Sequence, residues 1–82
     1  MFTIYTTPGC FVCKKTIAQL QAASVPCAVI DVSQDPEALT YVKEVLGAEA
    51  APVVVDNEHP EEWWCGPNPM GVAAIIKAHQ DA

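Results

Sequence analysis

Hydrophobic residues along the chain gather in short runs that alternate with stretches of helical spacing. The short runs lie at residues 2–6, 27–32 and 53–55, and proline, glycine or acidic residues border them. Such runs, rich in β-branched residues, are typical of strands. Residues 62–64 predict a short fourth strand at an edge of the sheet. The run at 27–32 is almost wholly apolar, which favours a central strand covered on both faces.

The stretches between these strands predict helices. From Cys10 to about Ser24 apolar residues recur at spacings of four and three, as expected for a helix with one buried face. The residues predicted for that face are Cys13, Ile17, Leu20 and Ser24. A second helix is predicted to begin at Asp35-Pro36, a capping carboxylate followed by a proline suited to the first helical position, and to end at Gly47. Its predicted apolar face consists of Leu39, Val42, Val45 and Leu46.

The same start signal recurs at Asn68-Pro69 and predicts a last helix. Its predicted buried stripe consists of Val72, Ile75, Ile76 and His79. The resulting order is βαβαββα. Two early strands joined through a helix should be parallel with a right-handed crossover, and the last two strands are close enough to form a hairpin. We therefore predict one α/β domain over residues 1–82, a four-stranded mixed sheet flanked by three helices that is similar to the thioredoxin fold.

Length and charge narrow the range of functions. A chain of 82 residues supports one small domain with a modest core. The net charge is −6 and the chain has four lysines and no arginine, so its surface would repel a phosphate backbone and nucleic-acid binding is not expected. No apolar run reaches the 18 residues of a membrane span, and the first residues lack the basic segment of a secretory signal. We expect a cytoplasmic monomer without membrane partners.

Four cysteines are the candidate chemistry, and they are Cys10, Cys13, Cys27 and Cys65. Structural zinc prefers two C-x-x-C pairs or a pair with suitably spaced histidines, whereas here one pair stands alone and the two histidines are twenty residues apart. An iron–sulfur cluster needs four ligands, but Cys27 falls inside a predicted strand. A metal or iron–sulfur module remains an alternative, to be tested by metal content. The preferred interpretation is a redox-active dithiol without metal or other cofactor.

Cys10 and Cys13 have the spacing and position that dithiol chemistry requires. Residues i and i+3 at a helix start are neighbours, within reach of a disulfide. Cys10 would face the unpaired N–H groups at the helix N-terminus, and Lys14 and Lys15 follow closely. Such surroundings lower a thiol pKa from about 8.5 to between ~3.5 and ~7.5. Cys10 is therefore the predicted nucleophile and Cys13 the resolving thiol.

The chain resembles the glutaredoxin-like proteins, and among them the NrdH-redoxins, over nearly its whole length. The stretch "IYTTPGCFVCKKT" resembles their Tyr-Thr-Lys-Pro-x-Cys-x-x-Cys opening, and "WCGPNP" lies where they have Trp-Ser-Gly-Phe-Arg-Pro. The resemblance implies electron transfer from NADPH through thioredoxin reductase to a protein disulfide, with ribonucleotide reductase as the expected acceptor. It also implies that the Ala51-Pro52 bond is cis, although X-Pro bonds are cis in only about 5–6% of cases.

The same resemblance implies a partner-binding groove around the dithiol. The residues expected to form it are Pro8, Phe11, Val12, Lys14, Ala51, Pro52, Trp64, Cys65 and Gly66. Phe11 is expected to be exposed there, and one of Trp63 and Trp64 to be core while the other lines the groove. Departures from the family pattern include Thr7 in place of lysine and Asn68 in place of arginine.

Two further readings of this region stay open. A glutathione-dependent glutaredoxin is an alternative function, although the loop at residues 64–67 lacks the Gly-Gly pair and following acid that usually bind the tripeptide. Trp64-Cys65-Gly66-Pro67 also matches most of a thioredoxin signature, but Asn68 stands where the second cysteine would be. We therefore expect Cys65 to be a third thiol near the site, able to form an off-pathway disulfide or adduct.

Overall fold

The computed structural model describes residues 2–81 and shows the predicted order of elements. The elements are β1 (Phe2–Thr6), α1 (Phe11–Ala22), β2 (Cys27–Asp31), α2 (Pro36–Thr40), the π-helical turn η1 (Tyr41–Val45), β3 (Val53–Asp56), β4 (His59–Cys65) and α3 (Pro69–Asp81). The strands form one mixed sheet in the order β2-β1-β3-β4, in which β1 and β2 are parallel and the other neighbours are antiparallel. The predicted fold class, a four-stranded mixed sheet with three helices, is confirmed.

Strand β2 lies at an edge of the sheet, so the prediction of a central position was wrong. Its apolar sequence has another cause, because helices partly cover both of its faces. Cys27 packs against the cluster beneath α1, while Ile30 packs against the cluster beneath α2. Val29 is 44% exposed. The central strands are β1 and β3. Three residues of β3, Val53, Val54 and Val55, are all buried.

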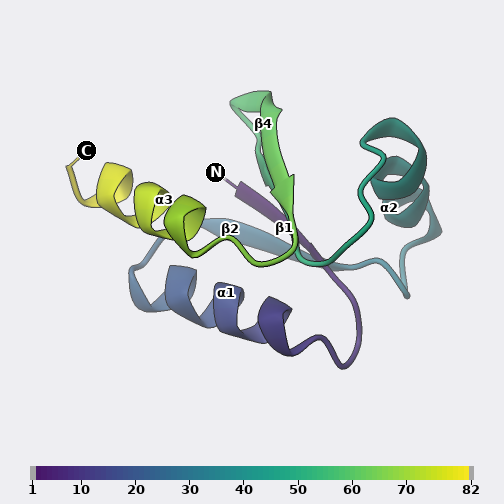
Figure 1. Ribbon diagram of the computed structural model, residues 1–82, viewed down its shortest axis with the longest axis horizontal. Coiled ribbons are helices and arrows are strands. Elements are labelled where there is room, and N and C mark those ends of the chain that lie inside the picture. The colour runs from purple at the N-terminus through teal and green to yellow at the C-terminus, as the bar shows by residue number, and fades with distance from the viewer. Residues whose placement is uncertain (1, 82) are drawn as a thin grey trace.

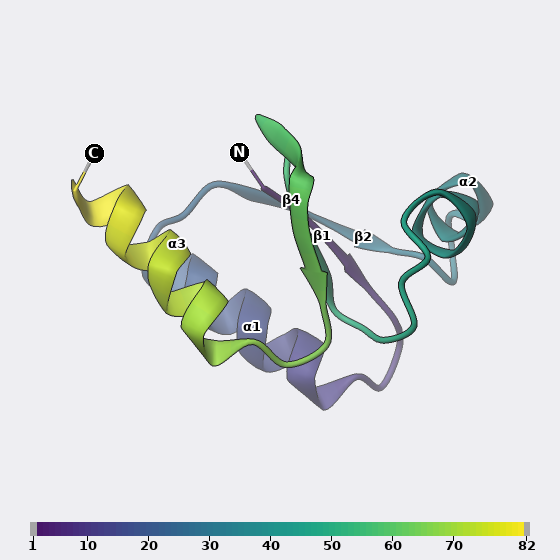
Figure 2. The ribbon, with the colours of Figure 1, turned by 45° about the horizontal axis from the view of Figure 1, so that its top comes forward.

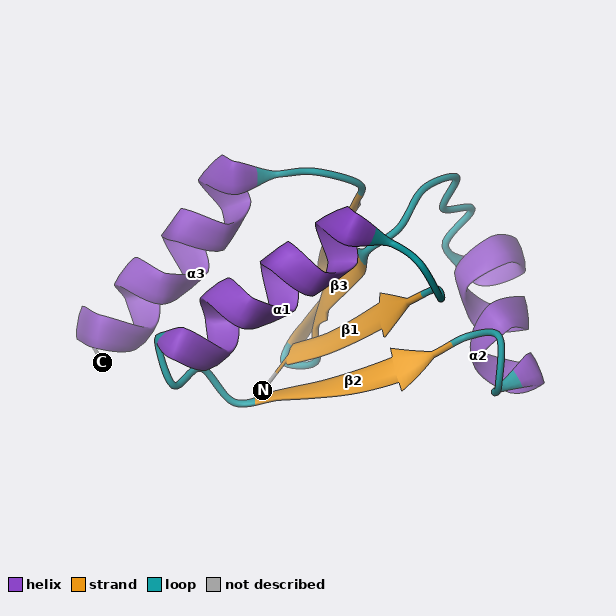
Figure 3. Cartoon of the chain, turned by 90° about the horizontal axis from the view of Figure 1, so that it is seen from below, coloured by secondary structure: helices purple, strands orange, loops and turns teal. Residues whose placement is uncertain are grey.

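Two hydrophobic cores lie on opposite faces of this sheet. Because side chains alternate along a strand, Val54 belongs to one core and Val53 and Val55 to the other. The first core lies beneath α1 and α3 and consists of Ile4, Leu20, Val25, Val54, Val72 and Ile75. The second lies beneath α2 and consists of Val32, Ala38, Val42, Val53 and Val55. Figures 1 and 2 show α1 and α3 side by side with α2 set apart from them. Figure 3 shows α1 and α3 running side by side on one side of the strands and α2 on the opposite side.

The second helix departs from a regular α-helix after its first turn. Its start is as predicted, since Asp35 accepts a hydrogen bond from the Ala38 N–H at 3.2 Å. From Tyr41 the bonding changes to i→i+5, because the Leu46 N–H donates to the Tyr41 carbonyl at 3.0 Å. This π turn places Val45 in solvent, 69% exposed. The predicted inclusion of Val45 in the apolar face is therefore wrong.

Two predicted helix-face residues are also exposed. Ser24 lies beyond the end of α1 and takes a positive φ of 59°, so it leaves the helical stripe. His79 is exposed although the stripe of α3 was predicted to include it. Figure 1 shows the last turns of α3 extending past the sheet, where no element covers them. Within residues 2–81, no helix is long and apolar enough to cross a membrane.

Candidate dithiol active site

A tight turn carries the chain from the end of β1 to the two cysteines. The Cys10 N–H donates to the Thr7 carbonyl at 3.4 Å, and Gly9 between them has a φ of +73°. Glycine adopts this left-handed conformation without steric cost. Cys10 is the N-cap of α1, and its sulfur accepts a hydrogen bond from the Cys13 N–H at 3.1 Å. The strand, turn and helix start are those predicted from the sequence.

Cys10 and Cys13 form a disulfide, with their Cα atoms 5.2 Å apart. The two differ in exposure. Cys10 is partly exposed, whereas Cys13 is 0% exposed and packed beneath the helix. Cys10 is therefore the member of the pair that a disulfide exchange partner can contact.

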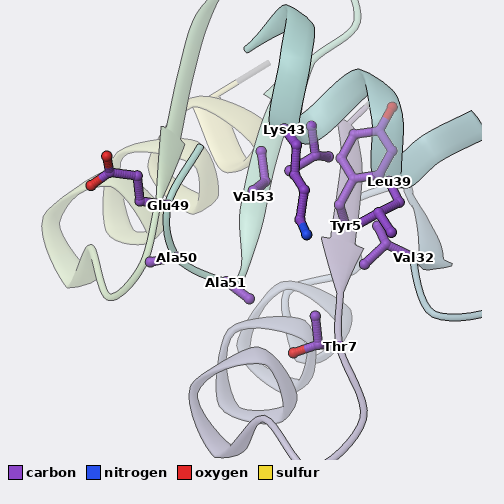
Figure 4. Close-up of a pocket in the computed structure, with 10 residues that line it drawn as sticks. Tyr5, Thr7, Val32, Leu39, Lys43, Glu49, Ala50, Ala51 and Val53 are labelled. Carbon is purple, nitrogen blue, oxygen red and sulfur yellow. The ribbon is translucent and has the colours of Figure 1, made fainter. Parts of the chain in front are cut away.

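The cis-proline segment lies beside the dithiol turn. The Ala51-Pro52 bond is cis, as expected. Pro52 is buried, and its carbonyl accepts the Gly66 N–H at 2.9 Å, which joins the start of β3 to the end of β4. Thr7 and Ala51 line the same pocket, and Figure 4 shows them close to the N-terminal end of α1. Thr7, which precedes the dithiol turn, and Ala51, which precedes the cis-proline, therefore border one surface.

Exposed apolar side chains occupy the N-terminal ends of α1 and α3. Phe11 is 80% exposed, as predicted, and Met70 at the start of α3 is 84% exposed. Pro8 and Lys14 are also exposed, and Val12 is half-buried. Val12 lines a groove between the N-terminal ends of α1 and α3, together with Lys15, Thr16, Gln19, Pro67, Asn68, Pro69 and Val72.

The loop predicted to line the groove divides between the two faces of the sheet. Trp64 is half-buried against the core beneath α1, while Trp63 and Cys65 pack against the core beneath α2. The two tryptophans thus pack against cores on opposite faces, and the expectation that one of them lines the groove stays a prediction. Gly66 is buried. The prediction that Cys65 forms an adduct near the dithiol stays a prediction. The Cys65 side chain packs among apolar neighbours on the α2 face of the sheet.

The four cysteines do not gather at one place. Cys27 begins β2 and Cys65 ends β4, and these strands lie at opposite edges of the sheet. Within the described residues, no group of three or more histidine, cysteine, aspartate or glutamate side chains has the geometry of a metal site. The arrangement therefore offers the pair at residues 10 and 13 as a dithiol, with the other two cysteines as separate free thiols.

Sequence reasoning missed a pocket beside Ala51. Its cavity is about 250 Å³, and its lining residues are Tyr5, Thr7, Val32, Leu39, Val42, Lys43, Glu49, Ala50, Ala51 and Val53 (Figure 4). Burial raises the pKa of the Tyr5 hydroxyl above its ordinary value, and the neighbouring Tyr41 and Asp35 raise it further. No single stretch of the sequence could have indicated the pocket, because its walls come from β1, α2, η1 and the loop before β3.

Comparison with known proteins decides the family. Residues 2–59 match the sequence model of the glutaredoxin family. The chain belongs to the glutaredoxin family. Gene 56 protein of Mycobacterium phage L5 is 42% identical to it over 57 residues, which are 70% of this chain and 55% of the phage protein. This glutaredoxin thus spans little more than half the length of that curated relative.

Solved structures agree with the family and the fold. NrdH-redoxin from Escherichia coli, described as a glutaredoxin-like protein with a thioredoxin-like activity profile, is similar with a TM-score of 0.78 and 26% identity. That match covers 89% of this chain and 91% of the other. The glutaredoxin from Archaeoglobus fulgidus has a TM-score of 0.75 at 22% identity, covering 93% of this chain and 85% of the other, and supports the fold. The chain therefore has a glutaredoxin-like thiol-disulfide oxidoreductase fold with a C-x-x-C pair.

Proposed function

We propose that the protein is a small electron carrier whose dithiol, Cys10 and Cys13, reduces disulfides of other proteins. The observation that supports this most strongly is the asymmetry of the pair. Cys10 is partly exposed and its sulfur accepts the Cys13 N–H at the start of α1, whereas Cys13 is fully buried. An exposed sulfur that receives N–H donation suits an attacking thiolate, and a shielded neighbour suits the resolving step.

The exchange proceeds in two balanced steps. The Cys10 thiolate attacks one sulfur of the target disulfide, a mixed disulfide forms, and the other target sulfur leaves as a thiolate that takes up a proton. The Cys13 sulfur, after losing its proton, then attacks the Cys10 sulfur, and the first target sulfur leaves in the same way. Two electrons and two protons pass to the target, and Cys10 and Cys13 end as the disulfide that the structure contains.

The oxidised pair must be reduced again before another turnover. We propose NADPH as the electron source through thioredoxin reductase, and a disulfide of ribonucleotide reductase as the acceptor. Similarity to NrdH-redoxin, itself described as thioredoxin-like in activity, supports a thioredoxin reductase more than glutathione. The reducing cytoplasm is the proposed compartment, because it keeps such dithiols available, and the proposed active form is a monomer.

The proposed partner groove consists of the residues predicted from the sequence. Phe11 and Lys14 stand on the exposed side of α1, and Ala51 offers backbone at the cis-proline. β1 pairs with β3 only as far as Tyr5↔Val53, and then turns away toward Cys10. An extended target segment added beside Ala51 would take the place that β1 leaves.

The test compares two reducing systems acting on the same model disulfide. NADPH with thioredoxin reductase should sustain turnover, and NADPH with glutathione and its reductase should sustain less. Faster turnover with glutathione would reverse the choice of reductant. Absence of turnover with both, although the reduced protein carries two free thiols at residues 10 and 13, would contradict the carrier function itself.

A further inference from the structure

The pocket beside Ala51 lies where a target segment would place the residue next to its cysteine. This inference rests on the proposed function. Successive side chains of an extended segment point to opposite faces. If the target cysteine points toward Cys10 on the α1 side, its immediate neighbour in the segment points toward the α2 side. The pocket is on that side, because Val32, Val42 and Val53 belong to the core beneath α2.

The size of the pocket suits one side chain. Its volume of about 250 Å³ is below the ~300–1,000 Å³ of sites that enclose a small molecule. Its walls are mostly aliphatic, from Val32, Leu39 and Val53. A side chain with an apolar stem would contact these walls.

Lys43 is the one cationic residue in the lining of this pocket. Figure 4 shows the Lys43 side chain running along the cavity, with its ammonium group directed toward Ala51 and Thr7. Within residues 2–81, no carboxylate forms a salt bridge with Lys43. Glu49 also lines the pocket, but its carboxylate points away from the Lys43 ammonium in Figure 4.

The charge of the whole molecule makes this position distinctive. The net charge is −6, so most of the surface repels an acidic partner. The lysines are only four, Lys14, Lys15, Lys43 and Lys77. Lys14 and Lys15 lie on α1, so Lys43 supplies the cation on the other side of the cis-proline segment. The exposed cation and the aliphatic walls together are complementary to a side chain that ends in a carboxylate.

We propose that this pocket is a specificity site for a glutamate next to the target cysteine, with Lys43 as the specificity-determining residue. The methylene groups of the glutamate contact Leu39 and Val53, and its carboxylate pairs with the Lys43 ammonium. An aspartate has one methylene group fewer and would bury less of its stem. The proposed site selects among target proteins and leaves the exchange steps at Cys10 and Cys13 unchanged.

The test uses disulfide-linked peptides that differ only beside the cysteine. The peptides carry either glutamate or glutamine at that position, on one side of the cysteine or the other. Their rates of reduction by the pre-reduced protein are measured in single-turnover stopped-flow reactions at low salt. The expected result is a preference of about two- to five-fold for glutamate, the range of one exposed ion pair. Salt should reduce this preference. The ratio should fall to about one in Lys43→Gln, and Lys43→Glu should prefer a lysine peptide.

Lys77→Gln is the matched control, because it removes the same charge from α3, which does not line the pocket. It should keep the glutamate preference. Equal rates for the glutamate and glutamine peptides, or a preference that survives Lys43→Gln, would overturn the proposal while leaving the carrier function intact. If Lys43→Gln lowered the rate of reduction of oxidised glutathione but of none of the peptides, the proposal would also be overturned, since the pocket would then hold a terminal carboxylate. Failure to reduce any peptide would instead contradict the proposed function.

Discussion

The side-chain amide of Asn68 occupies the space in which a Cβ atom of residue 71 would lie. Its Oδ1 accepts the Gly71 N–H at 3.0 Å and so caps α3. A Cβ built on Gly71 would lie 2.5 Å from Nδ2 of Asn68 and 3.1 Å from the edge of the Trp64 ring. The cap and the tryptophan together explain a glycine in the first turn of a helix.

Gly71→Ala should therefore fail to stabilise the protein. Alanine is favoured over glycine in a helix by about 1 kcal/mol, but the Cβ displaces the Asn68 cap, whose loss costs about 0.5–2 kcal/mol. We expect the free energy of unfolding to stay level or to fall by about 1 kcal/mol in urea titrations. In an Asn68→Ala background the same substitution should be less unfavourable, because only the Trp64 ring edge still crowds the Cβ. A gain of about 1 kcal/mol in the protein that retains Asn68 would show that the amide is not in the way.

Cysteine variants separate the proposed roles. Cys10→Ser should abolish turnover, because the free thiols Cys27 and Cys65 have no second cysteine three residues further on to resolve a mixed disulfide. Cys13→Ser should accumulate a mixed disulfide with a dithiol target, visible by mass spectrometry under non-reducing conditions. Cys65→Ser should retain turnover, since Cys65 packs on the α2 face. Turnover that survives Cys10→Ser but not Cys65→Ser would show that Cys65, and not Cys10, is the reactive thiol.

Local signals in the sequence predicted the elements well because they act over a few residues. Asp35 and Asn68 each stand before a proline, and both side chains cap the helices they precede. The C-x-x-C pair follows a strand and a turn, and it forms the N-terminus of α1 as predicted. The cis bond at Pro52 came from the resemblance to a family, since sequence alone favours trans.

Features that depend on distant segments escaped prediction. An apolar run such as that of β2 fits a central strand and also an edge strand with helices against both faces. Only the order of the strands in the sheet decides between these two positions. The exposure of Val45 depends on a π turn, whereas the periodicity applied to it assumes 3.6 residues per turn. The pocket beside Ala51 combines β1, α2, η1 and the loop before β3, so no single stretch contains its pattern.

Alanine substitutions at two neighbouring valines test the π turn. Val42 is 8% exposed within the core beneath α2, whereas Val45 is 69% exposed. Val42→Ala should lower the free energy of unfolding by about 1.5–3 kcal/mol, the worth of burying such a side chain. Val45→Ala should change it by no more than about 0.5 kcal/mol. Equal losses at the two positions, measured by urea unfolding, would indicate a regular helix with both valines buried.

Stability at alkaline pH should depend on Tyr5. Its pKa in the folded protein is raised, by burial first and then by Tyr41 and Asp35, whereas in the unfolded chain it is near 10. The unfolded state therefore loses its proton first, and the contribution of the neutral phenol to stability is full below about pH 10 and lost as pH rises from there through the folded pKa. Urea unfolding between about pH 9 and pH 11 should show this fall, and Tyr5→Phe should make the decline shallower. An identical pH profile for Tyr5→Phe and the unmodified protein would contradict the raised pKa. A titration followed by tyrosinate absorbance provides a direct check, because the phenol that loses its proton at the highest pH should be missing in Tyr5→Phe.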